Sequence, residues 1–125
     1  MRGTSTLSTA IRDFATSSSM IEPSFTFVAS SAAQFGYTVA ASTTSDLDPS
    51  FLNDGSTCNA GAGYTANRCW MSPSTTAYRI VNRSTSAPSG ATTTLTFHIE
   101  VPSNPSPSLD EDFYVATATL TATNQ

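Results

Sequence analysis

The alternating stretch at residues 91–101 constrains the fold of this chain more than any other feature of its sequence. Apolar residues at odd positions, among them Leu95, Phe97 and Ile99, alternate with polar residues at even positions. Successive side chains of a β-strand point to opposite faces of a sheet, so a period of two predicts a strand with one apolar and one polar face. In an antiparallel sheet we expect the apolar face to be buried and the polar face to meet water.

A second run, residues 113–123, alternates in the same way and is equally rich in β-branched residues. Shorter segments with strand patterns occur at residues 10–14, 24–30, 35–43, 69–70 and 77–82. Turns rich in Pro, Gly and Ser separate these segments, and none of them shows a convincing helical pattern. The sequence therefore predicts an all-β protein, a two-sheet antiparallel sandwich of about seven strands.

We expect one domain, because the chain has 125 residues. Residues 24–125 form the predicted β-sandwich domain, and residues 1–23 form an N-terminal arm or a first strand. Leu7, Ile11 and Phe14 are spaced as in a short helix, but the intervening Ser and Thr favour an extended chain. Such an arm can dock on its own domain as a first strand, or it can complete the sheet edge of a neighbouring copy.

The charge pattern argues against two classes of partner. The net charge is −4, Lys is absent, and the five Arg residues are scattered. Nucleic-acid binding requires a basic patch, and binding to an anionic membrane requires a basic cluster or a basic amphipathic helix. No apolar run approaches the roughly 20 residues that cross a bilayer, so we expect no membrane insertion in this segment.

Cys58 and Cys69 are the only cysteines, and they bracket a glycine-containing loop. Their spacing matches no zinc motif, and one histidine cannot complete a four-coordinate site with them. We therefore predict a local disulfide, which indicates an oxidising compartment. Two reduced thiols in a cytosolic protein are the alternative.

No combination of residues predicts catalysis, a cofactor or a metal site. His98 lies on the polar side of its segment and has no accompanying nucleophile motif. The acidic residues of segment 46–54 lack the glycine and glutamate of a calcium loop. Residues 110–112 are acidic and are expected to be solvated, where their charge discourages unwanted strand pairing. Asn82 begins a glycosylation sequon, and its use stays open.

Three aromatic residues are candidates for ligand stacking: Tyr64, Trp70 and Tyr78. On the surface of a β-sandwich such rings can stack on sugar rings, whereas packing in the core is their commoner role. For Trp70 we favour packing.

Four segments resemble secreted Ig-like β-sandwich modules of bacterial cell-surface and extracellular structural proteins. They are residues 35–41, the Cys58 to Trp70 loop, residues 95–105 and residues 114–122. The resemblance implies an Ig-like form of the sandwich, an extracellular or cell-surface location and no enzymatic activity. The two cysteines differ from the antibody pattern, because they close a local loop and do not bridge the sheets.

These observations lead us to expect a non-enzymatic structural or adhesive surface module. It could be a filament or matrix subunit that assembles by strand addition, with other copies of itself or other surface proteins as partners. A carbohydrate-binding module is the alternative, with glycans as partners and Tyr64, Trp70 and Tyr78 as the stacking residues. In the assembling form, Leu7, Ile11 and Phe14 belong to the assembly arm.

Overall fold

The computed structural model of this protein consists mostly of extended chain, and it describes residues 2–3, 11–14, 23–29 and 31–123. Within these residues the only helical elements are two short 3-10 turns, η1 (Thr44–Asp46) and η2 (Pro49–Phe51). The strands are β1 (Arg2–Gly3), β2 (Arg12–Asp13), β3 (Gln34–Ala41), β4 (Thr93–Glu100) and β5 (Tyr114–Val115). The prediction of a β-rich chain with little helix is confirmed.

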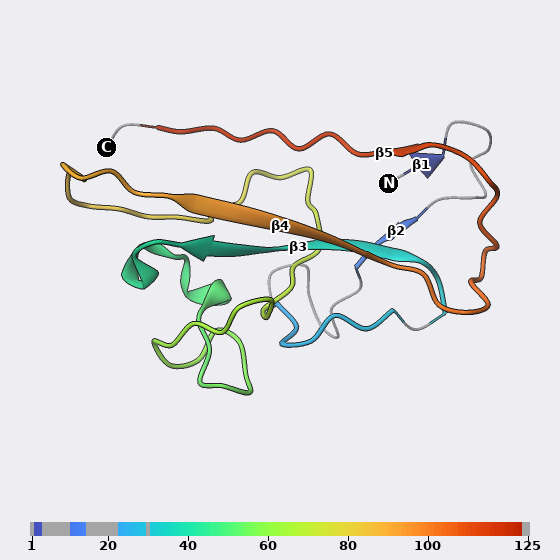
Figure 1. Cartoon of the computed structure of the whole chain (residues 1–125), viewed down its shortest axis with the longest axis horizontal. Coiled ribbons are helices and arrows are strands. Elements are labelled where there is room, and N and C mark those ends of the chain that lie inside the picture. The colour runs from blue at the N-terminus through green and yellow to red at the C-terminus, as the bar shows by residue number, and fades with distance from the viewer. Residues whose placement is uncertain (1, 4–10, 15–22, 30, 124–125) are drawn as a thin grey trace.

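The main sheet has three strands in the order β2-β3-β4 (Figure 1). Strand β3 lies in the middle, parallel to β2 and antiparallel to β4. Its eight residues pair with all eight residues of β4, from Gln34 opposite Glu100 to Ala41 opposite Thr93. A separate two-stranded ladder joins β1 to β5. This mixed sheet and short ladder do not confirm a seven-stranded, two-sheet Ig-like sandwich.

The predicted strands 24–30, 69–70 and 77–82 form no continuous ladder in the described residues. Segments 24–30 and 69–70 are joined by a single bridge between Ser24 and Trp70, and segment 77–82 pairs through a single bridge between Val81 and Leu47. Segment 77–82 lies beside residues 46–48, where the turns η1 and η2 follow closely on one another. A partner that curls into 3-10 turns cannot continue a ladder, which explains why the pairing stops after one bridge.

The two faces of the β3–β4 pair are covered differently from what the sequence predicts. Phe97 and Ile99 keep 48% and 45% of their surface exposed, whereas His98, on the opposite face, is partly buried. The ring of His98 lies 4.6 Å from Phe27 and 5.2 Å from Trp70, measured between centroids. The expectation of a buried apolar face and a wet polar face along β4 is therefore wrong.

Gly36 explains how the polar face became covered. It lies directly opposite His98, and the Cε2 atom of Phe27 would be 2.7 Å from a Cβ added to Gly36. The missing side chain therefore leaves a hollow that Phe27 fills, stacked on Phe14 at 4.2 Å between ring centroids. An aromatic layer thus covers this face of the sheet.

The other face of β3 contributes to two small cores. Val39 packs with Leu47, Phe51 and Met71 at one end of the sheet. Phe35 packs with Ile11 and Ala33 at the other end, where Leu109 and Tyr114 join them. Strand β4 lies at the sheet edge, so the apolar face of Phe97 and Ile99 is only partly covered.

The N-terminal segment is docked on its own domain wherever it is described. Ile11 and Phe14 are each 4% exposed, and Phe14 N–H donates to the carbonyl of Phe35. Strand β1 pairs with β5. Leu7 lies outside the described residues. Ile11 and Phe14 therefore lie in the core of their own domain, as in the self-docked first strand that the sequence analysis offers as one alternative.

The predicted C-terminal strand, residues 113–123, is paired only at Tyr114 and Val115. Residues 116–123 are extended and exposed, and none of the backbone hydrogen bonds outside the strands involves them. In Figure 1 they run towards the C-terminus in the direction opposite to β4. None of the helical segments in the described residues has the length and apolar character needed to span a bilayer.

Candidate functional site

The outer edge of β4 is the most distinctive surface of the molecule. Strand β4 ends the order β2-β3-β4, and in the described part of the chain no bridge connects its outer edge to another segment. A strand edge presents unpaired N–H and C=O groups, which can pair with a further strand. The edge extends over the eight residues of Thr93–Glu100.

The register shows which backbone groups of β4 face outward. Ser42 N–H donates to the carbonyl of Thr92 at 2.9 Å, which makes this pair a hydrogen-bonded one. Directly opposite residues of an antiparallel pair alternate between bonded and non-bonded pairs. The N–H and C=O groups of Leu95, Phe97 and Ile99 therefore point away from β3, towards the open edge.

The pairing of Tyr37 supports this assignment. Tyr37 lies opposite Phe97, and both its N–H and its C=O bond to Met71 on the other side of β3, at 3.0 and 2.7 Å. The backbone of Tyr37 is thus turned away from β4, as expected for a non-bonded pair. Phe97 is left with an outward N–H and an outward C=O.

Exposed apolar side chains accompany these backbone groups. Phe97 and Ile99 are nearly half exposed, and Val101 just beyond the strand is 51% exposed. Phe97 stacks on Phe35 at 5.7 Å between centroids, which holds its ring in place on the sheet. The edge therefore combines free hydrogen-bonding groups with a fixed apolar surface.

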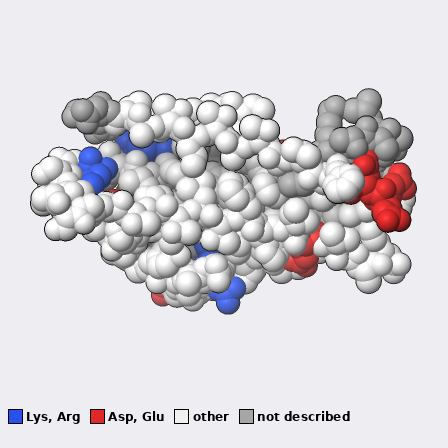
Figure 2. All heavy atoms as spheres, turned by 45° about the horizontal axis from the view of Figure 1, so that its top comes forward, with Lys and Arg blue, Asp and Glu red and all other residues white. Residues whose placement is uncertain are grey.

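The charges of the molecule lie mostly away from this edge. Residues 93–99 contain no Asp, Glu, Lys or Arg. Figure 2 shows one face that is largely uncharged, with acidic side chains gathered at one end. The acidic residues 110–112 belong to the segment between β4 and β5, which lies at the right-hand end of the molecule in Figure 1. Asp112 accepts a hydrogen bond from Phe113 N–H, and Tyr114 Oη donates to the carbonyl of Asp110.

The two cysteines form the predicted disulfide, with their Cα atoms 5.6 Å apart. Cys69 is completely buried, whereas Cys58 is partly exposed. The bond closes the loop on the side of the core that contains Phe51 and Met71. It also favours the expected oxidising compartment, because such bonds persist where thiols are not kept reduced.

Asn53 organises this loop from the inside. Its side-chain oxygen accepts bonds from Gly55 N–H at 3.0 Å and from Thr65 Oγ1 at 2.9 Å, and its own N–H donates to Gly63 C=O. The residue is 2% exposed. A Cβ at Gly63 would lie 2.8 Å from the carbonyl oxygen of Asn53, so only glycine fits that close approach. The sequence analysis did not identify Asn53, and its place before Asp54-Gly55 was the available turn signal.

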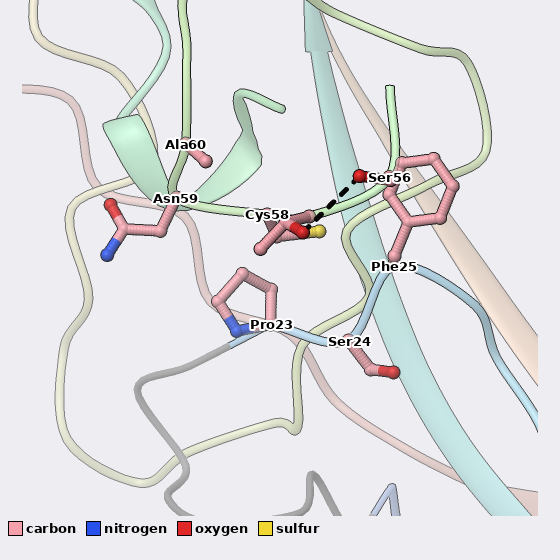
Figure 3. A pocket seen from close by; sticks show the side chains of 8 residues that line it. Pro23, Ser24, Phe25, Ser56, Cys58, Asn59 and Ala60 are labelled. Atoms are coloured by element: carbon pink, nitrogen blue, oxygen red, sulfur yellow. Dashed lines mark hydrogen bonds between the residues drawn. The ribbon is translucent and has the colours of Figure 1, made fainter. Parts of the chain in front are cut away.

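A shallow pocket of about 390 Å³ lies between the disulfide loop and the segment that begins at Pro23 (Figure 3). Pro23, Ser24 and Phe25 line one side, and residues 56–60 line the other. The lining residues carry no charge, so they supply only hydroxyl, amide and apolar contacts. Arg68 lies nearby but is directed over the ring of Phe25, 5.2 Å from its centroid.

The three candidate stacking residues pack against the protein. Trp70 is 5% exposed and donates from Nε1 to the carbonyl of Asn67, which confirms the packing role favoured for it. Tyr64 and Tyr78 are half-buried against the core around Val39. Burial is the main cause that raises the pKa of both phenols. The structure therefore presents no flat aromatic platform built from these three rings.

The acidic residues of segment 46–54 have structural partners. Asp46 forms a salt bridge with Arg83 at 2.6 Å, and Asp48 accepts bonds from Ser50 and Tyr78. Asp54 caps its own turn, because its carboxylate accepts from the N–H groups of the residues two and three positions later. Among the described residues no three His, Cys, Asp or Glu side chains are grouped to hold a metal ion.

No protein family matches this chain, and comparisons with curated proteins and with solved structures find no match either.

Proposed function

We propose that this protein is a non-enzymatic, extracellular structural module that builds assemblies by strand addition at the open edge of β4. The observation that carries the proposal is the edge itself, where outward backbone groups stand beside the half-exposed side chains of Phe97 and Ile99. Strand addition uses both features, because main-chain hydrogen bonds provide affinity and alternate side chains provide contact.

The composition of β4 supports the same proposal. Proteins that stay monomeric protect their edge strands with Lys, Pro, bulges or a covering segment. Strand β4 contains no Pro, the whole chain contains no Lys, and the pairing with β3 runs through all eight residues without a bulge. Apart from Glu100 at its end, the strand lacks these protections, and such an edge is favourable for pairing with another chain.

The disulfide supports the extracellular part of the proposal. Cys58 and Cys69 are bonded, and disulfides persist in oxidising environments such as the outside of the cell. The alternative function, carbohydrate binding, has no comparable support, because Trp70 is buried and Tyr64 and Tyr78 pack against the core.

Replacement of one outward N–H tests the proposal. Ile99→Pro removes an N–H that faces away from β3, and proline is tolerated on the outer side of an edge strand. We expect the native protein to assemble as its concentration rises, in light scattering and electron microscopy, and Ile99→Pro to remain a folded monomer. Ile99→Val is the matched control, because it keeps both the N–H and an apolar side chain, and it should assemble like the native protein.

His98→Pro provides the contrasting variant. The N–H of His98 points towards β3, so the substitution breaks the internal ladder and lowers stability instead of acting on assembly alone. A native protein that stays monomeric at every attainable concentration would overturn the proposed function. Equal assembly by Ile99→Pro and the native chain would show that β4 is not the contact.

A further inference from the structure

The segment 116–123 is extended chain, and no bridge joins it to any other segment in the part of the chain that the structure describes. Ala and Leu at its even positions alternate with Thr at its odd positions, and every residue in it is exposed. Leu120 keeps 67% of its surface in solvent. Extended chains with this pattern are stable when they pair, because pairing satisfies the backbone and covers one face.

Its own domain holds the start of this segment away from β4. Val115 and Tyr114 pair with Arg2 and Gly3 in a ladder that is separate from the main sheet. Tyr114 also packs on the core around Phe35. These contacts fix the beginning of the segment on a different sheet, and in Figure 1 the chain then runs in the direction opposite to β4; among the described residues no backbone hydrogen bond joins the two.

We propose that residues 116–123 pair with the open edge of β4 in a second copy of this chain. This inference rests on the proposed function and names its donor and its partner. Within the described residues, the molecule thus has an open strand edge at β4 and an extended C-terminal segment that pairs with no strand. The donor is therefore the C-terminal segment, since Ile11 and Phe14 of the N-terminal segment are already buried.

The side chains of donor and edge are compatible. On one face Ala118 and Leu120 would join the apolar row of Phe97 and Ile99, and on the other face the threonines of both strands would form a row. Small alanines leave room for the large rings and branches of β4, and cross-strand pairs of this kind stabilise a sheet. Glu100 is the only Asp, Glu, Lys or Arg in β4 and segment 116–123, so the contact brings together no pair of like charges.

The size of the contact favours an exchange between two copies. A strand of eight residues is about 26 Å long at about 3.3 Å per residue, and a strip about 10 Å wide covers roughly 260 Å² on each partner. One strand addition then buries roughly 500 Å², and a reciprocal exchange buries roughly 1,000 Å². The reciprocal value reaches the size at which specific interfaces begin.

The same contact is compatible with two symmetries. A two-fold exchange closes into a dimer, whereas a head-to-tail arrangement continues into a fibre. In either case each copy donates one segment and accepts one segment. The proposal concerns this contact, and both products contain it.

A mixing experiment between two blocked chains tests the proposal. The first chain ends at Val115, so it keeps the β4 edge but lacks the donor segment. The second is the full chain with Ile99→Pro, which keeps the donor segment but has a blocked edge. We expect each chain alone to be a monomer in size-exclusion chromatography with light scattering. A mixture at high concentration should form a one-to-one complex, which is weaker than the native assembly because it contains a single strand addition of roughly 500 Å².

A full-length variant protects the test against unfolding of the shortened chain. Thr119→Pro combined with Leu120→Pro removes two N–H groups from a segment that makes no backbone hydrogen bond to the described residues, so the fold should be unaffected. This variant should lose assembly, whereas Thr119→Ser combined with Leu120→Val should retain it. Trp70 fluorescence verifies the fold of each variant, since this is the only tryptophan and it is buried.

The outcomes separate this inference from the proposed function. If the native chain and Ile99→Pro behave as proposed but the chain ending at Val115 still assembles, the donor is another segment and the inference is overturned alone. Failure of the two blocked chains to form a complex also overturns it. If the native chain never assembles, the proposed function and the inference fall together.

Discussion

Gly36→Ala is the substitution whose effect the structure predicts most directly. The new Cβ would lie 2.7 Å from Cε2 of Phe27, 3.0 Å from the carbonyl oxygen of Met71 and 3.1 Å from Cβ of Phe14. The Phe27 ring can move, but the Met71 carbonyl belongs to a backbone that is bonded to β3. We therefore expect the new methyl group to displace the rings of the aromatic layer, which strains their packing.

The expected cost follows from two opposing effects. Adding one methyl group to a filled site typically destabilises a protein by about 1–3 kcal/mol. Replacing glycine by alanine within a strand returns about 0.5–1 kcal/mol of backbone entropy. The free energy of unfolding should therefore fall by up to about 2.5 kcal/mol, with a central value of about 1 kcal/mol, and at that central value the melting temperature should fall by about 4 °C.

Urea unfolding followed by tryptophan fluorescence measures this change at the site itself. Trp70 is the only tryptophan, and its ring lies 5.5 Å from Phe27 between centroids. The measurement should be made at a protein concentration below the onset of assembly, because assembly would stabilise the folded state. Phe27→Leu removes the closest atom and provides the second half of a double-mutant cycle.

The cycle contains the result that would refute the reasoning. If the Phe27 ring is the main obstacle, Gly36→Ala should cost about 1 kcal/mol less in the Phe27→Leu background than in the native protein. Additive effects of the two substitutions would show that the ring does not limit the space at Gly36.

Two further predictions concern the disulfide loop. Mass spectrometry should show that Cys58 and Cys69 resist alkylation until a reductant is added, and ready alkylation of the untreated protein would contradict this. Urea unfolding should show that reduction lowers the free energy of unfolding by about 3 kcal/mol, as expected for a loop of this length. Hydrogen bonds from the N–H groups of Thr57 and then Ser56 lower the pKa of Asp54 below its usual value of 3.8, so these bonds stabilise the turn above that value and are lost as the pH falls through the lowered pKa. An NMR titration of the Asp54 carboxyl group checks this, and a pKa at or above 3.8 would contradict it.

The two long strands could be predicted from the sequence because their signal is local. Segment 35–43 was expected as a strand and residues 34–41 form β3, while segment 91–101 contains β4 at residues 93–100. A period of two belongs to the strand itself, whatever lies against it. The disulfide was predictable for a similar reason, because the chain has two cysteines and no zinc motif to occupy them.

The covering of each face depended on residues far away in the sequence. The alternation of β4 shows which side chains share a face, but the face that is covered follows from Gly36 opposite His98 and from the rings of Phe27 and Trp70. Those rings belong to segments 24–30 and 69–70, whose strand patterns do not show which face of the sheet they cover. The half-exposed row of Phe97 and Ile99 follows from the position of β4 at the sheet edge.

The ends of the chain show the same division. The sequence alone determined that residues 113–123 favour an extended conformation and that Ile11 and Phe14 are apolar residues in an extended segment. Only the tertiary structure decided that Ile11 and Phe14 are buried in their own domain and that residues 116–123 are not paired with it. Propensity acts residue by residue, whereas pairing depends on whether an edge lies within reach, and β5 is held by β1 on a separate ladder.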